Sequence, residues 1–204
     1  MLLSNLFEPI GITVFALSGA LAARDRKMDW FGLLMLATTA ATGGGIIRDV
    51  VMDNGIPALF SHPEYMIYVA LACLVVILFR QRVDRHEKMI VWFDALGLAF
   101  FTIDAGSKVI DRQLGLMAFL FVAVISGVGG GVLRDLLSQE IPAILKQDVY
   151  AVAALIGALV YYALEHTALK GFAPTIGVVL IIVLRMYSYT HNIHLRRPAV
   201  HPKT

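Results

Sequence analysis

One motif occurs twice in this sequence and constrains the fold more than any other feature: three glycines, two aliphatic residues, an arginine and an aspartate. Residues 43–49 read GGGIIRD and residues 129–135 read GGGVLRD, so the copies lie 86 positions apart. Each glycine costs about 1 kcal/mol relative to alanine inside a helix, and charges among apolar neighbours are costly as well. Because the chain accepts these costs twice, we predict two helices that are broken at the glycines and face a polar path. The glycines are Gly43, Gly44, Gly45, Gly129, Gly130 and Gly131.

The composition indicates an all-α integral membrane protein. Of the 204 residues, 58% are hydrophobic and 16% are charged, whereas a soluble domain is about 45–50% apolar. The apolar residues form runs close to the roughly 20 residues that a helical span requires. These runs fill the chain, so we predict a single transmembrane domain over residues 1–204 with the lipid bilayer as a partner. The net charge of +2 gives no reason to expect nucleic-acid binding.

Seven apolar runs are predicted to cross the membrane as helices, with edges defined to a few residues. The second run contains the first glycine triplet and the fifth contains the second. No lysine or arginine precedes the first run, so it lacks the charged region of a signal peptide and is expected to be retained. The predicted spans cover about residues 7–23, 30–47, 65–79, 90–109, 114–133, 149–164 and 172–189.

The distribution of lysine and arginine predicts the orientation, because cytoplasmic loops are enriched in both. With seven spans, the first, third and fifth connections share a side with the C-terminus. The opposite side carries only Arg48, Lys108, Arg112 and Lys170. We therefore predict an integral plasma (inner) membrane protein with its N-terminus outside and its C-terminus in the cytoplasm. The basic residues on the predicted cytoplasmic side are Arg24, Arg26, Lys27, Arg80, Arg82, Arg85, Lys88, Arg134, Lys146, Arg196, Arg197 and Lys203.

The two halves of the chain form a repeat with a shift of 86 residues. Each repeat, about residues 7–79 and about residues 90–164, holds three predicted spans. Three is an odd number, so the second copy must enter the membrane from the opposite side, and the span at residues 172–189 is left over. Inverted repeats with interrupted helices in corresponding positions point to a transport path near the membrane midplane. Matched pairs include Glu8 with Asp94, Phe15 with Phe101, Asp25 with Asp111, Arg26 with Arg112 and, after a slip of one residue, Ile56-Pro57 with Ile141-Pro142.

The glycine triplets admit two interpretations. If they interrupt the spans, the freed backbone groups line a water-filled path, since irregular backbone at membrane depth occurs only there or inside protein. Alternatively, the small residues allow neighbouring helices to pack closely. The duplication at matching positions favours the first interpretation. On that basis, leucine at Gly44 or Gly130 should impair transport more than folding, and alanine should be milder.

The charged residues of the motif are candidates for pore-lining or gating roles: Arg48, Asp49, Arg134 and Asp135. Neighbours on a helix point about 100° apart, so we do not expect Arg48 to pair with Asp49. The arginines could end the spans and extend to the lipid headgroups. We favour the other interpretation, in which they find partners in the opposite repeat.

A further pair of charges, Asp104 and Lys108, lies four residues apart on one face of the fourth predicted span. Their counterparts in the first repeat are Ser18 and Ala22, so the pair breaks the symmetry. It is either a structural pair near the membrane edge or a gating or ion-facing pair. Uncharged hydroxyl groups are weaker candidates for lining a pore, because hydroxyls within a span often bond to their own helix. These candidates are Ser18, Thr38, Thr39, Thr42 and Ser126.

Several functional classes find no support in the sequence. No lysine follows either glycine triplet as a P-loop requires, and no nucleophile and base suggest a hydrolase. The six histidines do not gather into a metal site, and we expect His191 and His194 to lie at the membrane interface. We therefore predict no enzymatic activity, no metal site and no resident cofactor, with K⁺ or Na⁺ as possible permeant ions.

The doubled GGG-x-x-R-D motif, the seven spans and the inverted repeat resemble the prokaryotic branch of the trimeric intracellular cation (TRIC) channels. The similarity extends from Phe7 to about Tyr189. It implies a homotrimer in which each protomer has its own pore for potassium and other monovalent cations. It also implies second and fifth helices that are kinked at the two glycine triplets. Lys108 would lie where family members carry basic residues connected with gating.

The resemblance leaves two activities open, because prokaryotic relatives have also been described as small-amino-acid, glycine-type transporters. A channel needs a continuous polar file with weak sites, whereas a transporter needs an occluding site and a large rearrangement. The threonines of the second span suit a channel without excluding a transporter. A structural or assembly protein with no path is the third alternative.

Overall fold

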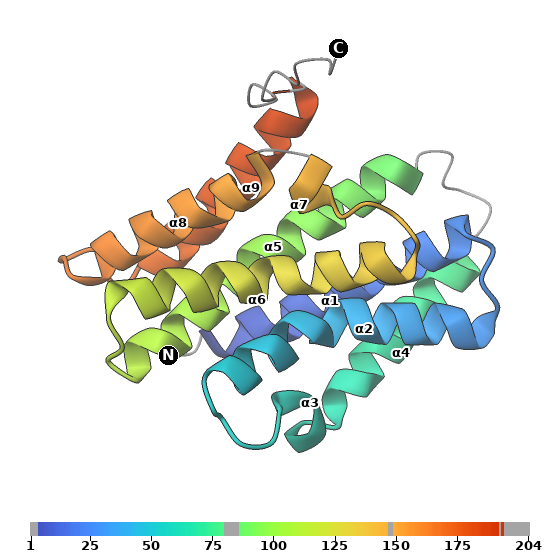
Figure 1. The fold of residues 1–204 in the computed structure, drawn as a ribbon, viewed down its shortest axis with the longest axis horizontal. Helices are drawn as coiled ribbons and strands as arrows, with labels where there is room; N and C mark the ends of the chain where they lie inside the picture. The colour runs from blue at the N-terminus through green and yellow to red at the C-terminus, as the bar shows by residue number, and fades with distance from the viewer. Residues whose placement is uncertain (1–3, 80–85, 147–148, 192, 194–204) are drawn as a thin grey trace, which may run out of the picture.

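The computed structural model describes residues 4–79, 86–146, 149–191 and 193. In this part of the chain all regular structure is helical, and nine α-helices are present (Figure 1). Seven correspond to the predicted apolar runs, while α3 and α7 are four-residue helices within connections. The helices are α1 (Ser4–Asp25), α2 (Trp30–Val51), α3 (Ala58–Ser61), α4 (Glu64–Leu78), α5 (His86–Asp111), α6 (Leu116–Leu137), α7 (Ala143–Lys146), α8 (Val149–Glu165) and α9 (Ala173–Thr190).

Within the described residues, five helices are long and apolar enough to cross a bilayer: α1, α2, α5, α6 and α9. The other two apolar helices, α4 and α8, have 15 and 17 residues and lie below or at the lower limit for a span. The protein is therefore a membrane protein whose described regular structure is helical, and five of its helices have the length and hydropathy of a span; the count of seven spans stays a prediction. Each of the two shorter helices is preceded by α3 or α7, so part of each preceding connection is itself helical.

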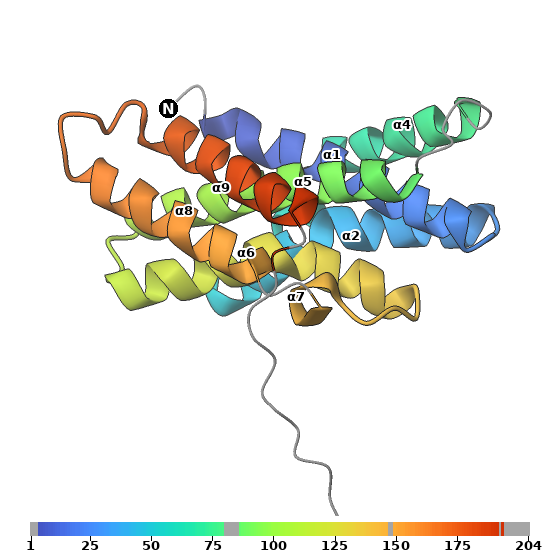
Figure 2. The same cartoon turned by 90° about the horizontal axis from the view of Figure 1, so that it is seen from above.

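Four helices form the centre of the molecule. In the pairwise contacts, α1 packs against α5 and α2, and α6 packs against α2 and α5. Figure 1 shows that α1 begins at the end of the molecule where α5 finishes, so the corresponding helices of the two repeats run in opposite directions. The outer helices follow the same scheme, with α4 on α1 and α8 on α5, while α9 packs against α8 and α5 (Figure 2).

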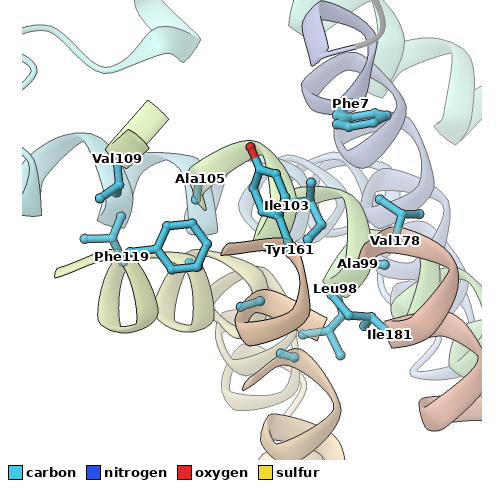
Figure 3. Close-up of a cluster of buried hydrophobic side chains, with 14 of the residues drawn as sticks. Phe7, Leu98, Ala99, Ile103, Ala105, Val109, Phe119, Tyr161, Val178 and Ile181 are labelled. Carbon is cyan, nitrogen blue, oxygen red and sulfur yellow. The ribbon is translucent and has the colours of Figure 1, made fainter. Parts of the chain in front are cut away.

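The apolar core is divided into two clusters that follow the two repeats. One is formed mainly by α1, α2 and α4, and the other mainly by α5, α6, α8 and α9. Figure 3 shows the second cluster, where Phe119 of α6 lies near Tyr161 of α8, with their ring centroids 5.8 Å apart. Ile181 brings α9 into the same cluster, so the helix that has no repeat counterpart extends the core of the second half only.

The glycine triplets do not break their helices, and this corrects the prediction from sequence. Both α2 and α6 run without interruption through them. The triplets instead lie where α2 and α6 pack: a methyl group at Gly44 would overlap the carbonyl oxygen of Ser126, and one at Gly130 would overlap that of Ala40. Ala40 and Ser126 are repeat counterparts, so the two contacts are symmetric. Gly44 and Gly130 are needed because two helix backbones approach here without room for a side chain.

Candidate functional site: two buried charge clusters

Arg48 of α2 lies at the centre of a group of three carboxylates. Its Nε donates to Asp49 Oδ1 at 2.8 Å, its Nη1 to Asp104 Oδ2 at 2.7 Å and its Nη2 to Glu8 Oε1 at 2.9 Å. The partners come from α2, α5 and α1, and the Arg48 side chain is only 1% exposed. A planar guanidinium with five N–H donors can serve three acceptors at once, which an ammonium on a flexible stem does poorly.

Lys108 links two of the same carboxylates. Its Nζ lies 2.7 Å from Glu8 Oε2 and 2.9 Å from Asp104 Oδ2. The pairing of Asp104 with Lys108 is the contact that their four-residue spacing predicts. Glu8, Arg48, Asp49, Asp104 and Lys108 are called the first charge cluster below. Lys108 is its most solvent-accessible member, with 31% of its side chain exposed.

Arg134 of α6 organises an equivalent group in the second half. Its Nη1 donates to Asp94 Oδ1 at 2.8 Å and also to Ser18 Oγ, while Nε and Nη2 reach Asp135 Oδ1 at 2.9 and 2.7 Å. The Arg134 side chain is 5% exposed. Ser18, Asp94, Arg134 and Asp135 are called the second charge cluster. It brings together α1, α5 and α6, as the first cluster brings together α1, α5 and α2.

The two clusters are related by the sequence repeat, position by position. Glu8 in the first cluster corresponds to Asp94 in the second, and Asp104 corresponds to Ser18. Each arginine therefore bonds to two side chains of its own repeat and to one of the opposite repeat. The symmetry fails only in charge, because Ser18 replaces a carboxylate and Ala22 stands where Lys108 would be.

The aspartates of the motif have a second role as caps of the short helices. Asp49 Oδ2 accepts a hydrogen bond from the backbone N–H of Ala58 at 2.8 Å, and Asp135 Oδ2 accepts one from Ala143 at the same distance. Ala58 and Ala143 are the first residues of α3 and α7. A carboxylate at a helix N-terminus satisfies an unpaired N–H and suits the helix dipole. Each aspartate thus ties a short helix to its arginine.

The contacts decide between the two interpretations of the arginines. Arg48 and Arg134 are buried and bonded across the repeats, so they do not extend to the headgroups as the alternative interpretation proposes. The expectation that Arg48 cannot pair with Asp49 is wrong. The arginine side chain is long enough to fold back onto the neighbouring carboxylate, even though the two Cβ atoms point apart on the helix.

The uncharged candidates divide into two groups. The hydroxyls of Thr38, Thr39 and Thr42 donate at 2.8 Å to carbonyls four residues earlier in their own helix. This is the local bonding expected of threonines within a span. Ser18 belongs to the second charge cluster, and the buried Ser126 hydroxyl has no hydrogen-bond partner among the described residues.

Sequence reasoning used Glu8 and Asp94 to align the repeats but did not select them as site residues. The structure places each against the arginine of its own repeat. The signal was present: an acidic residue near the start of an apolar run, repeated 86 positions later. A carboxylate in a span is rare and marks a functional site by default.

The first charge cluster borders a cavity of about 400 Å³ at the end of the molecule where α1 begins and α5 finishes. The wall is acidic, and Lys108 and His62 are its only basic side chains. His62 stacks on Tyr65, with their ring centroids 5.1 Å apart. This space is called the acidic cavity below. Its carboxylates are Glu8, Glu64, Asp104 and Asp111.

The acidic wall of this cavity favours positive charge. Among the described residues, no group of three or more His, Cys, Asp or Glu side chains is arranged to hold a metal ion. His191 is exposed at the end of α9, while His194 lies outside the described residues. Arginine, lysine or backbone N–H groups engage the buried carboxylates. The wall carboxylates outside the first charge cluster are Glu64 and Asp111.

Known proteins resemble this chain along most of its length. A family model described as a glycine transporter matches residues 5–81 and 91–166. The UPF0126 inner membrane protein YadS of Escherichia coli strain K12 is 34% identical over 189 residues, which cover 91% of each chain. The UPF0126 membrane protein YvgT of Bacillus subtilis is 33% identical over 193 residues, or 92% of this chain and 93% of the relative.

Solved structures match the fold as well. A TRIC trimeric intracellular cation channel orthologue from Rhodobacter sphaeroides is 26% identical, with a TM-score of 0.89 over 95% of this chain and 100% of the other. A second TRIC cation channel is 31% identical, with a TM-score of 0.85 over 98% of both chains. The match of the family model to both repeats, the bacterial relatives and these structures show that this chain belongs to the glycine-transporter (UPF0126) family, the prokaryotic branch of the TRIC proteins.

Proposed function

We propose that this protein is a monovalent cation channel, permeable to potassium, with one pore in each protomer of a homotrimer. The path enters at the acidic cavity and runs past the first charge cluster between α1, α2 and α5. The observation that carries the proposal is the acidic cavity. Its wall has four carboxylates against Lys108 and His62, and two of the four, Glu64 and Asp111, lie outside the first charge cluster. Rings of Asp and Glu favour cations at the mouths of channels.

A smaller space continues from the acidic cavity toward the interior. It has a volume of about 10 Å³ and shares Glu8 and Tyr65 with the larger cavity. Its other walls include Thr42, Gly45 and Asp49 of α2. A space of this size is about the minimum for one water molecule. We infer that the path narrows here and that conduction requires α1, α2 and α5 to separate at this point.

Purified protein in liposomes tests the proposal. A potassium gradient should generate a membrane potential that a voltage-sensitive dye reports. Adding glycine should not change the rate at which this potential develops. Labelled glycine should not accumulate in the same vesicles. Accumulation of glycine without potassium flux would instead establish the transporter. The match to a family model described as a glycine transporter favours this alternative.

The proposed orientation places the N-terminus outside and the C-terminus in the cytoplasm of the inner membrane. The lysine and arginine bias is the reason, although six of the twelve residues on that side lie outside the described residues: Arg80, Arg82, Arg85, Arg196, Arg197 and Lys203. Reporter fusions after Thr204 and in the connection between α4 and α5 should both read cytoplasmic. A periplasmic signal at either position would contradict the inverted arrangement of spans.

Lys108 is proposed to hold the mouth closed by joining α1 to α5 through Glu8 and Asp104. The second charge cluster supplies a test, because Ser18 and Ala22 occupy the equivalent positions there. Asp104→Ser combined with Lys108→Ala keeps the net charge and reproduces side chains that this fold already accommodates. We expect the double variant to fold normally and to conduct potassium several-fold faster. An unchanged or lower flux would assign the Asp104–Lys108 pair to structure alone.

A further inference from the structure

A second cavity, of about 460 Å³, lies at the opposite end of α1 from the acidic cavity. The turn between α1 and α2 supplies two cations and an aromatic ring to its wall, and apolar side chains of α2 and α4 supply much of the rest. The residues that matter for the argument are Arg24, Lys27, Trp30, Leu33, Val76 and Ile77. Neither repeat symmetry nor the proposed conduction path accounts for this basic pocket.

The internal repeat provides a built-in comparison for the turn. The turn that follows α1 recurs after α5, and the matching residues Lys27 and Gln113 have φ angles of 55° and 56°. Arg26 Nη1 donates to Ser138 O at 2.8 Å, and its counterpart Arg112 donates to Met52 O at 2.6 Å. The acceptors are the C-cap residues of α6 and α2. The shared arginine therefore fastens both turns in the same way.

The two cations of the basic pocket are among the residues in which the turns differ. Ile110 stands at the position of Arg24, and Gln113 stands at the position of Lys27. The second turn adopts the same backbone without either charge, so the backbone of the turn does not require them. Arg24 Nη1 also donates to the carbonyl oxygen of Val76 at 3.5 Å, which holds its side chain at the wall of the pocket. The one acidic side chain on the wall, Asp29, already accepts a hydrogen bond from the N–H of Gly32 at 2.7 Å as the N-cap of α2.

The level of the pocket relative to the bilayer indicates its ligand. One span ends at Asp25 and the next begins at Trp30, so the turn lies at the membrane–water boundary. Trp30 is 72% exposed, as tryptophans of the interfacial belt are. Leu33 continues the wall toward the hydrocarbon. Basic pockets of this kind between membrane helices bind anionic lipid headgroups.

We propose that the basic pocket binds an anionic phospholipid, with its phosphate between Arg24 and Lys27. The upper part of one acyl chain lies against Leu33, Val76 and Ile77. The positive end of the α2 dipole, at Trp30, adds to the attraction for phosphate. The inference needs the chain to lie in a membrane and does not depend on conduction, so the two proposals fail separately.

Lipid-dependent thermal unfolding of the purified full-length protein in detergent tests the site. The test variant is Arg24→Gln with Lys27→Gln; the second change installs the residue type of the matching turn. The control variant, Lys88→Gln with Lys170→Gln, removes the same charge from two exposed lysines elsewhere. Phosphatidylglycerol should raise the midpoint temperature of thermal unfolding for the wild type and the control variant. The test variant should need a concentration of this lipid at least tenfold higher than the wild type does to reach half of the maximal increase in midpoint temperature.

Three outcomes would overturn the proposal: an equal response of the test variant, an equal response of the wild type to phosphatidylcholine, or an equal response to inorganic phosphate. The last would identify a free-anion site rather than a lipid site. A second measurement does not depend on stability. With Trp92 replaced by phenylalanine, Trp30 is the remaining tryptophan. Brominated phosphatidylglycerol should then quench its fluorescence more than brominated phosphatidylcholine does, and equal quenching would contradict the site.

Discussion

Replacing Arg134 by alanine is expected to abolish cation flux and to lower the midpoint of thermal unfolding by roughly 10 °C. The substitution leaves the buried carboxylate of Asp94 and the partly buried one of Asp135 without the guanidinium that bonds to both. An uncompensated buried charge costs about 3–5 kcal/mol. Arg48→Ala should be less severe, because Lys108 still bonds to Glu8 and Asp104. Thermal unfolding of both variants, measured side by side, shows whether Arg134→Ala lowers the midpoint temperature more than Arg48→Ala does.

Lysine at the same two positions separates charge from geometry. Arg134→Lys restores a cation but cannot reach Ser18, Asp94 and Asp135 together, so we expect only partial recovery of flux and thermal stability. Arg112→Lys is the matched control, because the one hydrogen bond described for Arg112 goes to the carbonyl of Met52, and lysine can also donate to a carbonyl. Wild-type behaviour of Arg48→Lys and Arg134→Lys in both assays would show that the forked contacts are dispensable.

Alanine at Gly44 is expected to destabilise the protein strongly, whereas alanine at Gly45 should be almost neutral. The new methyl group at Gly44 would overlap the backbone carbonyl of Ser126, which cannot move unless α2 and α6 separate. At Gly45 the nearest atom is Phe101 Cε1 at 3.6 Å, an ordinary contact. Overpacking a tight site costs about 1–3 kcal/mol. Thermal unfolding and size-exclusion profiles of the two variants provide the comparison.

This result would replace the expectation, drawn from the sequence, that alanine is mild and that the triplets matter for transport more than for folding. Gly130→Ala should behave like Gly44→Ala, since its methyl group would overlap the carbonyl of Ala40. If alanine at Gly44 and Gly45 gave equal stabilities, the close contact of α2 with α6 would not be what the triplets provide.

Local hydropathy explains which helices the sequence predicts. Apolar runs locate α1, α2, α5, α6 and α9 because helix formation in a membrane depends on local hydropathy and length. The runs at residues 65–79 and 149–164 also locate α4 and α8, but they do not reveal α3 and α7. A four-residue helix has no periodicity of its own, and each of these two starts at an N–H that an aspartate eight or nine residues earlier caps.

The sequence predicts some of the residues of the two charge clusters but not all of them. The doubled motif identifies Arg48, Asp49, Arg134 and Asp135, and the four-residue spacing identifies Asp104 with Lys108. Glu8 and Asp94 were seen only as a matched pair in the alignment of repeats. Their role depends on the packing of α1 and α5 against the arginines, which a linear pattern does not contain.

The sequence by itself determined the membrane class, the 86-residue repeat and the positions of the charges that the repeat duplicates, because hydropathy, periodicity and self-similarity are properties of the chain order. Only the tertiary structure decided which charges meet. The bonds of Arg48 and Arg134 to the other repeat join residues 56 and 116 positions apart. It also decided that the glycine triplets pack α2 against α6 instead of breaking them, because the distance between two helix axes is fixed by the side chains of both.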